Sequence, residues 1–302
     1  MSDHSLVLSD GRCLSYRLEG VDGGVPVFMF HGIPGSRLCG EGMSDDPLIH
    51  EFGVPVVLPD RPGMGYSHDH PGRSFKSWAD DVAAVADCLG IERFHVAGGS
   101  GGGPHALACG VYLGSRILSI SVIAGAAPPE LPGLSRGMAR GNRLVFLLAR
   151  RIPSVLGWSF KSYAQQLERD PQRLVRAIKT QLCDWDLRVL NARSAESDPM
   201  RLSIADLQEA FRQGHDGVLR DFLLVGRPWD LNFGAIRARV FLWHGESDTL
   251  MPFRPVRTLA KALPRCRAHF LPDAGHLLLE DSSVGRRILE CICSADSEAP
   301  RP

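Results

Sequence analysis

The sequence predicts an α/β protein in which a mostly parallel β-sheet has helices on both faces and is interrupted by a helical insertion. In the first third of the chain, short β-rich runs alternate with helix-like stretches, as in parallel sheets covered on both sides. Residues 128–228 carry helical signals but no buried-strand runs, and two further strand-like runs follow them.

The expected strands are short apolar runs rich in β-branched and aromatic residues. They are Ser5–Leu8, Cys13–Arg17, Val25–Phe30, Val54–Leu58, Phe94–Ala97, Ile117–Ala124, Arg239–His244 and Ala268–Leu271. Ser74–Leu89 reads as an amphipathic helix with an apolar stripe, and Gly90 is placed to end it. Further helices are expected within Ser36–Phe52, from Gly103 onward, and over Leu277–Cys293.

The insertion is expected to divide one core, residues 1–127 and 229–302, from a helical cap at residues 128–228. Asp170-Pro171 is typical of a helix N-cap followed by proline. Ser203-x-x-Asp206 resembles a capping box for a helix that runs to Gly214. Two sequential domains are the alternative, but two strands alone after residue 228 would not make a stable sheet.

Composition favours an ordinary globular chain. The 34 basic and 34 acidic residues balance, which gives no electrostatic reason to expect nucleic acid or an anionic membrane as partner. Leu144–Ala149 is too short to span a bilayer, and the start of the chain lacks the features of a signal peptide. The eight cysteines show no CxxC spacing, so we expect free thiols, a cytoplasmic location and no metal or other cofactor.

The strongest chemical signal is Gly98-Gly99-Ser100-Gly101-Gly102. A G-x-S-x-G turn marks a catalytic serine when a strand precedes it and a helix follows, as expected here. Gly98 and Gly102 leave room for a very tight turn that lifts the hydroxyl of Ser100 into the open. A phosphate-binding loop would need a nearby lysine, and a dinucleotide loop would leave residues 25–58 unexplained.

A second signal, His31-Gly32-Ile33-Pro34, follows the strand Val25–Phe30 directly. Acyl transfer needs two backbone N–H donors for the oxyanion, and the expected donors are Ile33 and Gly101. The alternative for this stretch is an ordinary glycine-proline turn. We expect His31 to be a structural hydrogen-bonding residue.

These motifs, together with Asp60-Arg61-Pro62-Gly63-Met64-Gly65-Tyr66-Ser67, resemble the α/β-hydrolase superfamily in its HGxP-bearing branch. That branch includes serine esterases, proline-iminopeptidase-like enzymes, epoxide hydrolases and haloalkane dehalogenases. The resemblance implies an α/β-hydrolase fold with an inserted helical cap. Epoxide hydrolases and dehalogenases use an aspartate nucleophile, so Ser100 argues against both. We interpret Asp60 and Arg61 as scaffold residues.

In this fold the catalytic order is serine, acid, histidine, which makes His276 the expected base because it follows the last strand. Its G-H-x-x-x-x-E context also resembles the family pattern. Asp248 and Glu246 both follow the strand Arg239–His244, and the family motif H-G-x-x-D favours Asp248 as the acid. The preceding strand offers no carboxylate until Glu130.

The expected substrate is a small molecule, namely a carboxylic ester or thioester that is largely apolar. The alternatives are a proline-iminopeptidase-like aminopeptidase and a catalytically silent binding protein of the same fold. Gly101 and Gly102 stand where the iminopeptidase branch usually has Trp-Gly. The sequence does not indicate the oligomeric state of the protein. Apolar residues of the insertion either line a pocket or pack the cap onto the core, and these are Met138, Leu144, Phe146, Leu147, Leu148 and Trp158.

Overall fold

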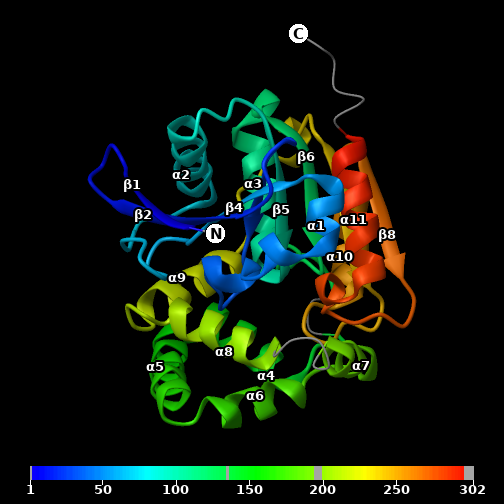
Figure 1. The fold of residues 1–302 in the computed structure, drawn as a ribbon. Helices are drawn as coiled ribbons and strands as arrows, with labels where there is room; N and C mark the ends of the chain where they lie inside the picture. Colours follow the sequence, from blue (N-terminus) through cyan, green and yellow to red (C-terminus); the bar gives the residue numbers. More distant parts are fainter. Residues whose placement is uncertain (1, 134–135, 194–198, 296–302) are drawn as a thin grey trace.

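The computed structural model describes residues 2–133, 136–193 and 199–295. Within them eight strands form one sheet in the order β1-β2-β4-β3-β5-β6-β7-β8 (Figure 1). The strands are β1 Ser2–Val7, β2 Cys13–Gly20, β3 Val27–Phe30, β4 Pro55–Pro59, β5 Phe94–Gly99, β6 Ile117–Ile123, β7 Arg239–Gly245 and β8 Cys266–Leu271. All eight expected strands are present, with ends displaced by a few residues at most.

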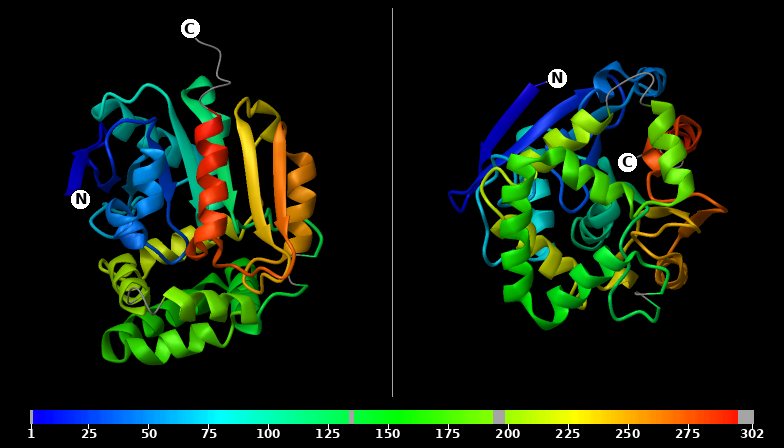
Figure 2. Two further views of the ribbon diagram at one scale, coloured as in Figure 1. Left: turned by 45° about the vertical axis from the view of Figure 1, so that its right-hand side comes forward. Right: turned by 90° about the horizontal axis from the view of Figure 1, so that it is seen from below.

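The sheet is mostly parallel, as expected. β1 and β2 run antiparallel to their neighbours, whereas β4, β3, β5, β6, β7 and β8 are parallel. The carboxyl ends of the parallel strands therefore meet at one edge, which faces the helices of the insertion (Figure 2, left). From β3 the chain passes to β4 on one side and then to β5 on the other. A crevice for a ligand is expected at such a switch point.

Helices cover both faces of the sheet, which confirms the predicted class. On one face, an apolar cluster that includes Phe30, Trp78 and Leu242 packs the strands against α2 (Phe75–Cys88), α3 (Gly103–Tyr112) and α10 (Phe253–Ala262). On the other face, Ile49, Trp243 and Ile288 belong to a cluster with α1 (Pro47–Phe52) and α11 (Ser282–Ser294). Side chains that alternate along each strand supply the two clusters.

Six α-helices lie between β6 and β7 in the described part of the chain; they lie under the sheet edge (Figure 2, left) and come to the front when the molecule is seen from below (Figure 2, right). They are α4 Arg140–Arg151, α5 Pro153–Arg169, α6 Pro171–Lys179, α7 Asp184–Arg193, α8 Pro199–Ala210 and α9 Asp216–Val225. Their own apolar cluster includes Leu156, Phe160 and Phe222, and it also takes in Met64 of the core. Of the apolar residues considered for this region, Met138 and Phe146 are buried, whereas Leu144, Leu147 and Trp158 are exposed.

Helix ends account for the differences from the sequence analysis. The expected capping box at Ser203 is wrong, because α8 begins at Pro199 and Ser203 lies inside it. The closing helix begins at Ser282 instead of Leu277, since Asp281 caps it by accepting the N–H groups of Ser283 and Val284. The predicted N-cap at Asp170 is confirmed by its bond from the Arg173 N–H.

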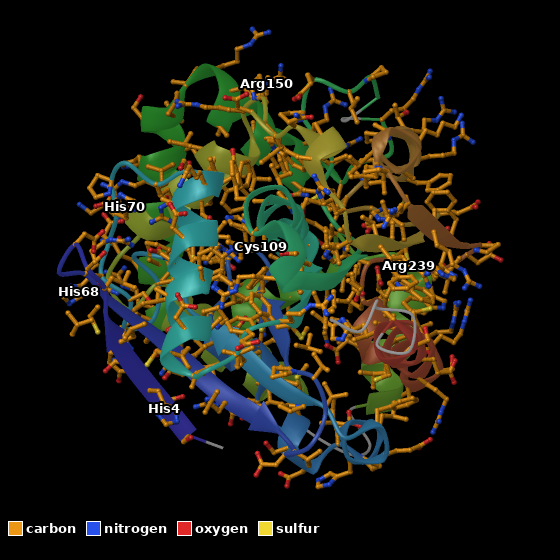
Figure 3. All side chains as sticks on the ribbon, turned by 90° about the horizontal axis from the view of Figure 1, so that it is seen from above. His4, His68, His70, Cys109, Arg150 and Arg239 are labelled. Atoms are coloured by element: carbon orange, nitrogen blue, oxygen red, sulfur yellow. The ribbon has the colours of Figure 1, made fainter. Side chains whose placement is uncertain are left out.

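Ser36–Phe52 contains two short 3-10 helices before α1, separated by Gly42 in a left-handed conformation. The eight cysteines form no disulfide in the described residues, and Cys109 is buried in α3 near the centre of the molecule (Figure 3). No helix among the described residues is long and apolar enough to cross a membrane.

Candidate active site

The turn at Ser100 joins β5 to α3 through a 3-10 turn, Ser100–Gly102. Ser100 has a φ of 51°, in the left-handed region that non-glycine residues rarely adopt. A Cβ on Gly98 would lie 2.3 Å from the Gly102 carbonyl oxygen, and one on Gly102 would lie 2.2 Å from the Phe30 carbonyl oxygen. Only glycine fits at these two positions, as the sequence pattern indicates.

The loop after β3 lies against this turn. A Cβ on Gly101 would lie 2.4 Å from the side chain of Ile33, so Ile33 packs against Gly101 and the two expected oxyanion donors come from neighbouring segments. His31 is buried, accepts the Arg61 N–H at 3.2 Å through Nε2, and donates to the Gly32 carbonyl at 2.9 Å through Nδ1. Its role is therefore structural, as expected.

Asp248 and His276 are joined by a hydrogen bond of 2.7 Å between Oδ2 and Nδ1. The second carboxylate oxygen, Oδ1, accepts the backbone N–H groups of Leu250 and Met251, both at 2.8 Å. With Nδ1–H donating to the carboxylate, Nε2 of His276 is left free to accept a proton. Glu246, the rival acid, is exposed two residues earlier.

His244, at the end of β7, is a contributor that the sequence analysis missed. Its Nε2 donates to the Met251 carbonyl at 2.7 Å, and the same nitrogen lies 3.6 Å from Asp248 Oδ2. Burial lowers the pKa of His244, so the imidazole is neutral at pH 7. His244 therefore fixes the loop that carries the Asp248 carboxylate and itself stays uncharged.

The two partners shift each other's pKa in opposite directions. Burial opposes the charged form of His276, but the charge and hydrogen bond of Asp248, aided by Asp186, raise its pKa above the ordinary value. Burial would likewise raise the pKa of Asp248, but His276, His244 and the Met251 N–H bring it below the ordinary value. The pair thus favours an ionised acid beside a base that readily takes up a proton.

Ser100 lies on the same sheet edge as this pair. It follows Gly99 of β5, which is in register with Ile123 of β6, and Ile123 is in register with Trp243 of β7. Leu279, three residues after His276, lies 4.0 Å from the Cβ position of Gly99. No hydrogen bond links Ser100 Oγ to His276 within the described residues; such bonds often tighten only when substrate is present.

Asp186 of α7 holds the loop of the candidate base, and the sequence analysis assigned it no role. It is fully buried and accepts the Leu277 N–H at 2.9 Å. A Cβ on Gly275 would lie 2.4 Å from the Asp186 carboxyl group, so this glycine makes room for the carboxylate. The insertion also binds the loop that follows Asp248, because Thr249 Oγ1 donates to the Gln181 carbonyl at 2.6 Å.

A second buried network surrounds the Asp60-Arg61 turn. Arg37 Nη1 contacts Asp60 at 2.8 Å and Glu209 of α8 at 2.6 Å. Asp206 accepts both the N–H and the hydroxyl of Ser36, at 2.8 and 2.7 Å. Asp206 thus binds the core instead of capping a helix, and burial raises its pKa to about 7.

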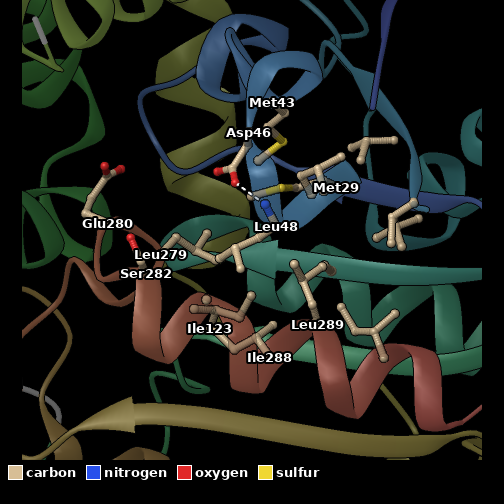
Figure 4. A pocket seen from close by; sticks show the side chains of 17 residues that line it. Met29, Met43, Asp46, Leu48, Ile123, Leu279, Glu280, Ser282, Ile288 and Leu289 are labelled. Atoms are coloured by element: carbon tan, nitrogen blue, oxygen red, sulfur yellow. Dashed lines mark hydrogen bonds between the residues drawn. The ribbon is translucent and has the colours of Figure 1, made fainter. Parts of the chain in front are cut away.

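Two cavities adjoin one another on the α1 side of the site. One of about 370 Å³ lies between α7, α8 and the core, and its lining includes Leu38, Leu190, Leu202, Asp206, Leu279 and Leu277, the residue that follows His276 in the chain. The other, of about 110 Å³, is apolar and lies between α1, α11 and the sheet (Figure 4). Met29, Met43 and Leu279 line both.

The sequence matches the family described as the alpha/beta hydrolase fold over residues 25–283. The chain belongs to this family. The match covers both the turn at Ser100 and the Asp248–His276 pair. The mostly parallel sheet with helices on both faces described above is accordingly that of the alpha/beta hydrolase fold.

Similar proteins include enzymes of several activities. A proline iminopeptidase of Xanthomonas citri is 25% identical over 93% of this chain and 92% of its own. An uncharacterized hydrolase of Bacillus subtilis is 25% identical, and the match spans only 63% of each chain. The structure of a thermophilic esterase from Thermogutta terrifontis superimposes with a TM-score of 0.64 at 20% identity, covering 99% of both chains.

No group of three or more histidine, cysteine, aspartate or glutamate side chains is arranged to hold a metal ion in the part of the chain that the structure describes.

The tight turn predicts unequal effects of alanine at two neighbouring glycines. Gly98→Ala should lower the melting temperature strongly, because its Cβ would meet a backbone oxygen at 2.3 Å. Gly99→Ala should leave the melting temperature nearly unchanged, since its nearest neighbour lies 4.0 Å away. Thermal unfolding followed by circular dichroism compares the two, and equal melting temperatures would contradict this account of the turn.

The raised pKa of His276 predicts the acid side of the pH profile. A base must be neutral to act, so activity is expected to fall as the pH drops through the histidine pKa. The midpoint should lie above the ordinary histidine value of about 6.5. The measurement is kcat/KM for an activated ester from pH 5 to 9; a midpoint below about 6 would argue against the Asp248–His276 pair as its source.

Proposed function

We propose that the protein is a serine hydrolase that cleaves carboxylic esters or thioesters of small to medium, largely apolar molecules through an acyl-enzyme. The observation that carries the proposal is the 2.7 Å bond between His276 and Asp248 at the sheet edge that also bears the strained Ser100 turn. The esterase from Thermogutta terrifontis shares this fold. In this proposal residues 128–228 act as a cap over the site.

Acylation begins when His276 Nε2 removes the proton of the Ser100 hydroxyl while Oγ attacks the substrate carbonyl carbon. Asp248 keeps Nδ1 protonated and stabilises the imidazolium that forms. The N–H groups of Ile33 and Gly101 receive the negative oxygen of the tetrahedral intermediate. His276 then gives its proton to the departing alkoxide or thiolate, and the acyl group stays on Ser100.

Deacylation repeats these steps with water. His276 removes a proton from the water as its oxygen attacks the acyl carbon, and the same two N–H groups hold the second oxyanion. The bond to Ser100 Oγ then breaks and the serine regains its proton from the imidazolium. The products are a carboxylic acid and the free enzyme.

The cavity of about 370 Å³ beside Leu277 supports the proposed size and polarity of the substrate. Pockets for small ligands combine apolar side chains with a few polar groups, and five of the fourteen residues that line this cavity are leucines from the core and from α7 and α8. A modest acyl or alcohol group would fit there.

An aminopeptidase is the second candidate. It is favoured by the relative named proline iminopeptidase and by four acidic residues, Glu41, Asp46, Asp206 and Glu280, that line the same cavity. A free α-ammonium needs such partners. Two of these carboxylates already have other roles, however: Asp206 holds Ser36, and Asp46 caps α1. We therefore retain the esterase as the first candidate.

Ser100→Ala should abolish hydrolysis of p-nitrophenyl butyrate and labelling by a fluorophosphonate probe, while the melting temperature stays close to that of the wild type. Loss of a nucleophile typically costs on the order of 10⁴–10⁶ in kcat. Retention of activity within about tenfold of wild type would move the nucleophile elsewhere. A silent binding protein would show neither hydrolysis nor labelling before the substitution.

The two candidate acids should differ. Asp248→Asn should lower kcat by roughly 10²–10⁴ because the amide favours the wrong histidine tautomer. Glu246→Gln is the matched control, since it removes the same charge from an exposed position two residues away. Initial rates with p-nitrophenyl butyrate rank the two variants, and a larger loss in Glu246→Gln would assign the acid to that residue.

The wild-type enzyme should prefer an ester to an aminoacyl anilide. We compare kcat/KM for p-nitrophenyl butyrate with the values for prolyl and alanyl p-nitroanilide at one pH. The ester is also the intrinsically easier substrate, so only a higher value for an anilide is decisive, and it would replace the esterase by an aminopeptidase.

A further inference from the structure

Asp221 is a buried carboxylate of α9, and the catalytic steps above do not use it. It is fully inaccessible to solvent, and its partners lead to both backbone segments of the proposed oxyanion hole. We propose that Asp221 is a positioning residue that holds these two segments through Arg61 and His105. The inference rests on the proposed function.

The first connection runs through Arg61. Its Nε donates to Asp221 Oδ2 at 2.8 Å, while Nη1 and Nη2 donate to the carbonyl oxygens of His31 and Gly32, both at 2.7 Å. The Gly32 carbonyl and the Ile33 N–H belong to one trans peptide, so they point in opposite directions. By holding the carbonyl, Arg61 sets the direction of the Ile33 donor and polarises it.

The second connection runs through His105 in α3. Its Nδ1 lies 3.0 Å from the Gly101 carbonyl oxygen, and its Nε2 lies 3.3 Å from Asp221 Oδ1. The ring is held edge-on between Phe75 and Trp78. The Gly101 carbonyl belongs to the peptide that follows the Gly101 N–H. His105 therefore fixes the position of Gly101, the residue that carries the second oxyanion donor.

The positive charges of Arg61 and Arg73 keep Asp221 ionised, whereas burial lowers the pKa of His105, whose Nε2 lies against the carboxylate. Arg61 contacts one carboxylate oxygen, while Arg73 Nη1 lies 3.8 Å and His105 lies 3.3 Å from the other. Burial would raise the pKa of Asp221, but Arg61, His105 and Arg73 bring it well below the ordinary value. Without this carboxylate, Arg61 would be a buried cation that has lost its direct ion pair, and it would be driven to shift.

A purely structural role would change stability and leave transition-state binding in proportion to ground-state binding. A positioning role makes a different prediction, because oxyanion donors act on the tetrahedral species and much less on the planar substrate. The ratio of the affinity for a tetrahedral ligand to the affinity for a planar ligand therefore distinguishes a positioning role from a purely structural one.

The experiment compares Asp221→Asn with Asp69→Asn in the full-length protein. Asp69 is the matched control because it pairs with Arg73 and Arg220 in the same charged cluster but touches neither oxyanion segment. The probes are phenylboronic acid, which forms a tetrahedral adduct with a catalytic serine, and N-(4-nitrophenyl)butyramide as a planar ground-state ligand. Kinetics with p-nitrophenyl butyrate give kcat and KM.

Asp221→Asn should lower both kcat and the affinity for phenylboronic acid by about tenfold or more, with KM and affinity for the amide changed by less than about threefold. Asp221→Ala, which also removes the hydrogen bond to Arg61, should lose about 10²–10³ if it folds. Asp69→Asn should stay within about threefold of the wild type in every measurement.

Equal effects of Asp221→Asn and Asp69→Asn would overturn the inference, and so would a loss shared equally between the boronic acid and the amide. Failure of the proposed function looks different. In that case the wild type shows no ester hydrolysis, or Ser100→Ala hydrolyses the ester as fast as the wild type.

Discussion

The turn around Ser100 depends on backbone atoms that approach each other with no side chain between them. Gly98 faces the Gly102 carbonyl, and Gly102 faces the Phe30 carbonyl at the end of the neighbouring strand. This contact brings the loop after β3 against the loop after β5, so Ile33 and Gly101 can offer their N–H groups from one small region. Neither the strained φ of Ser100 nor the arrangement of the donors could persist if those strands separated.

Features with a local cause could be read from the sequence. The alternation of apolar residues in the strands, the glycines around Ser100 and the position of His276 after the last strand all act within a few residues. The start of α11 was missed although Asp281-Ser282 is an ordinary N-cap signal; the apolar residues just before it made the helix look longer. Ser203-x-x-Asp206 shows the opposite error, since a capping pattern occurred inside a helix.

Contacts between distant segments gave no local signal. Asp186 meets Leu277, 91 residues away, and Asp221 meets Arg61, 160 residues away. The sequence analysis assigned no role to Asp186 or Asp221, because carboxylates on helices are usually solvated. Burial distinguishes these two, and burial follows from how the insertion sits on the sheet edge. Such residues become visible only when the tertiary structure is known.

The position of these carboxylates bears on how such a protein could be re-engineered. A helical segment inserted between two strands invites exchange between relatives, as though it were an independent module. Here the segment between β6 and β7 also contributes Asp186 and Asp221, whose partners are backbone and side-chain groups of the core. A chimera that imports a foreign insertion would leave Arg61 buried opposite a new neighbour, so matching residues would have to be grafted with it. The exposed side chains Leu144 and Leu147 of α4 and Trp158 of α5 take no part in these contacts, so substitutions there escape this constraint.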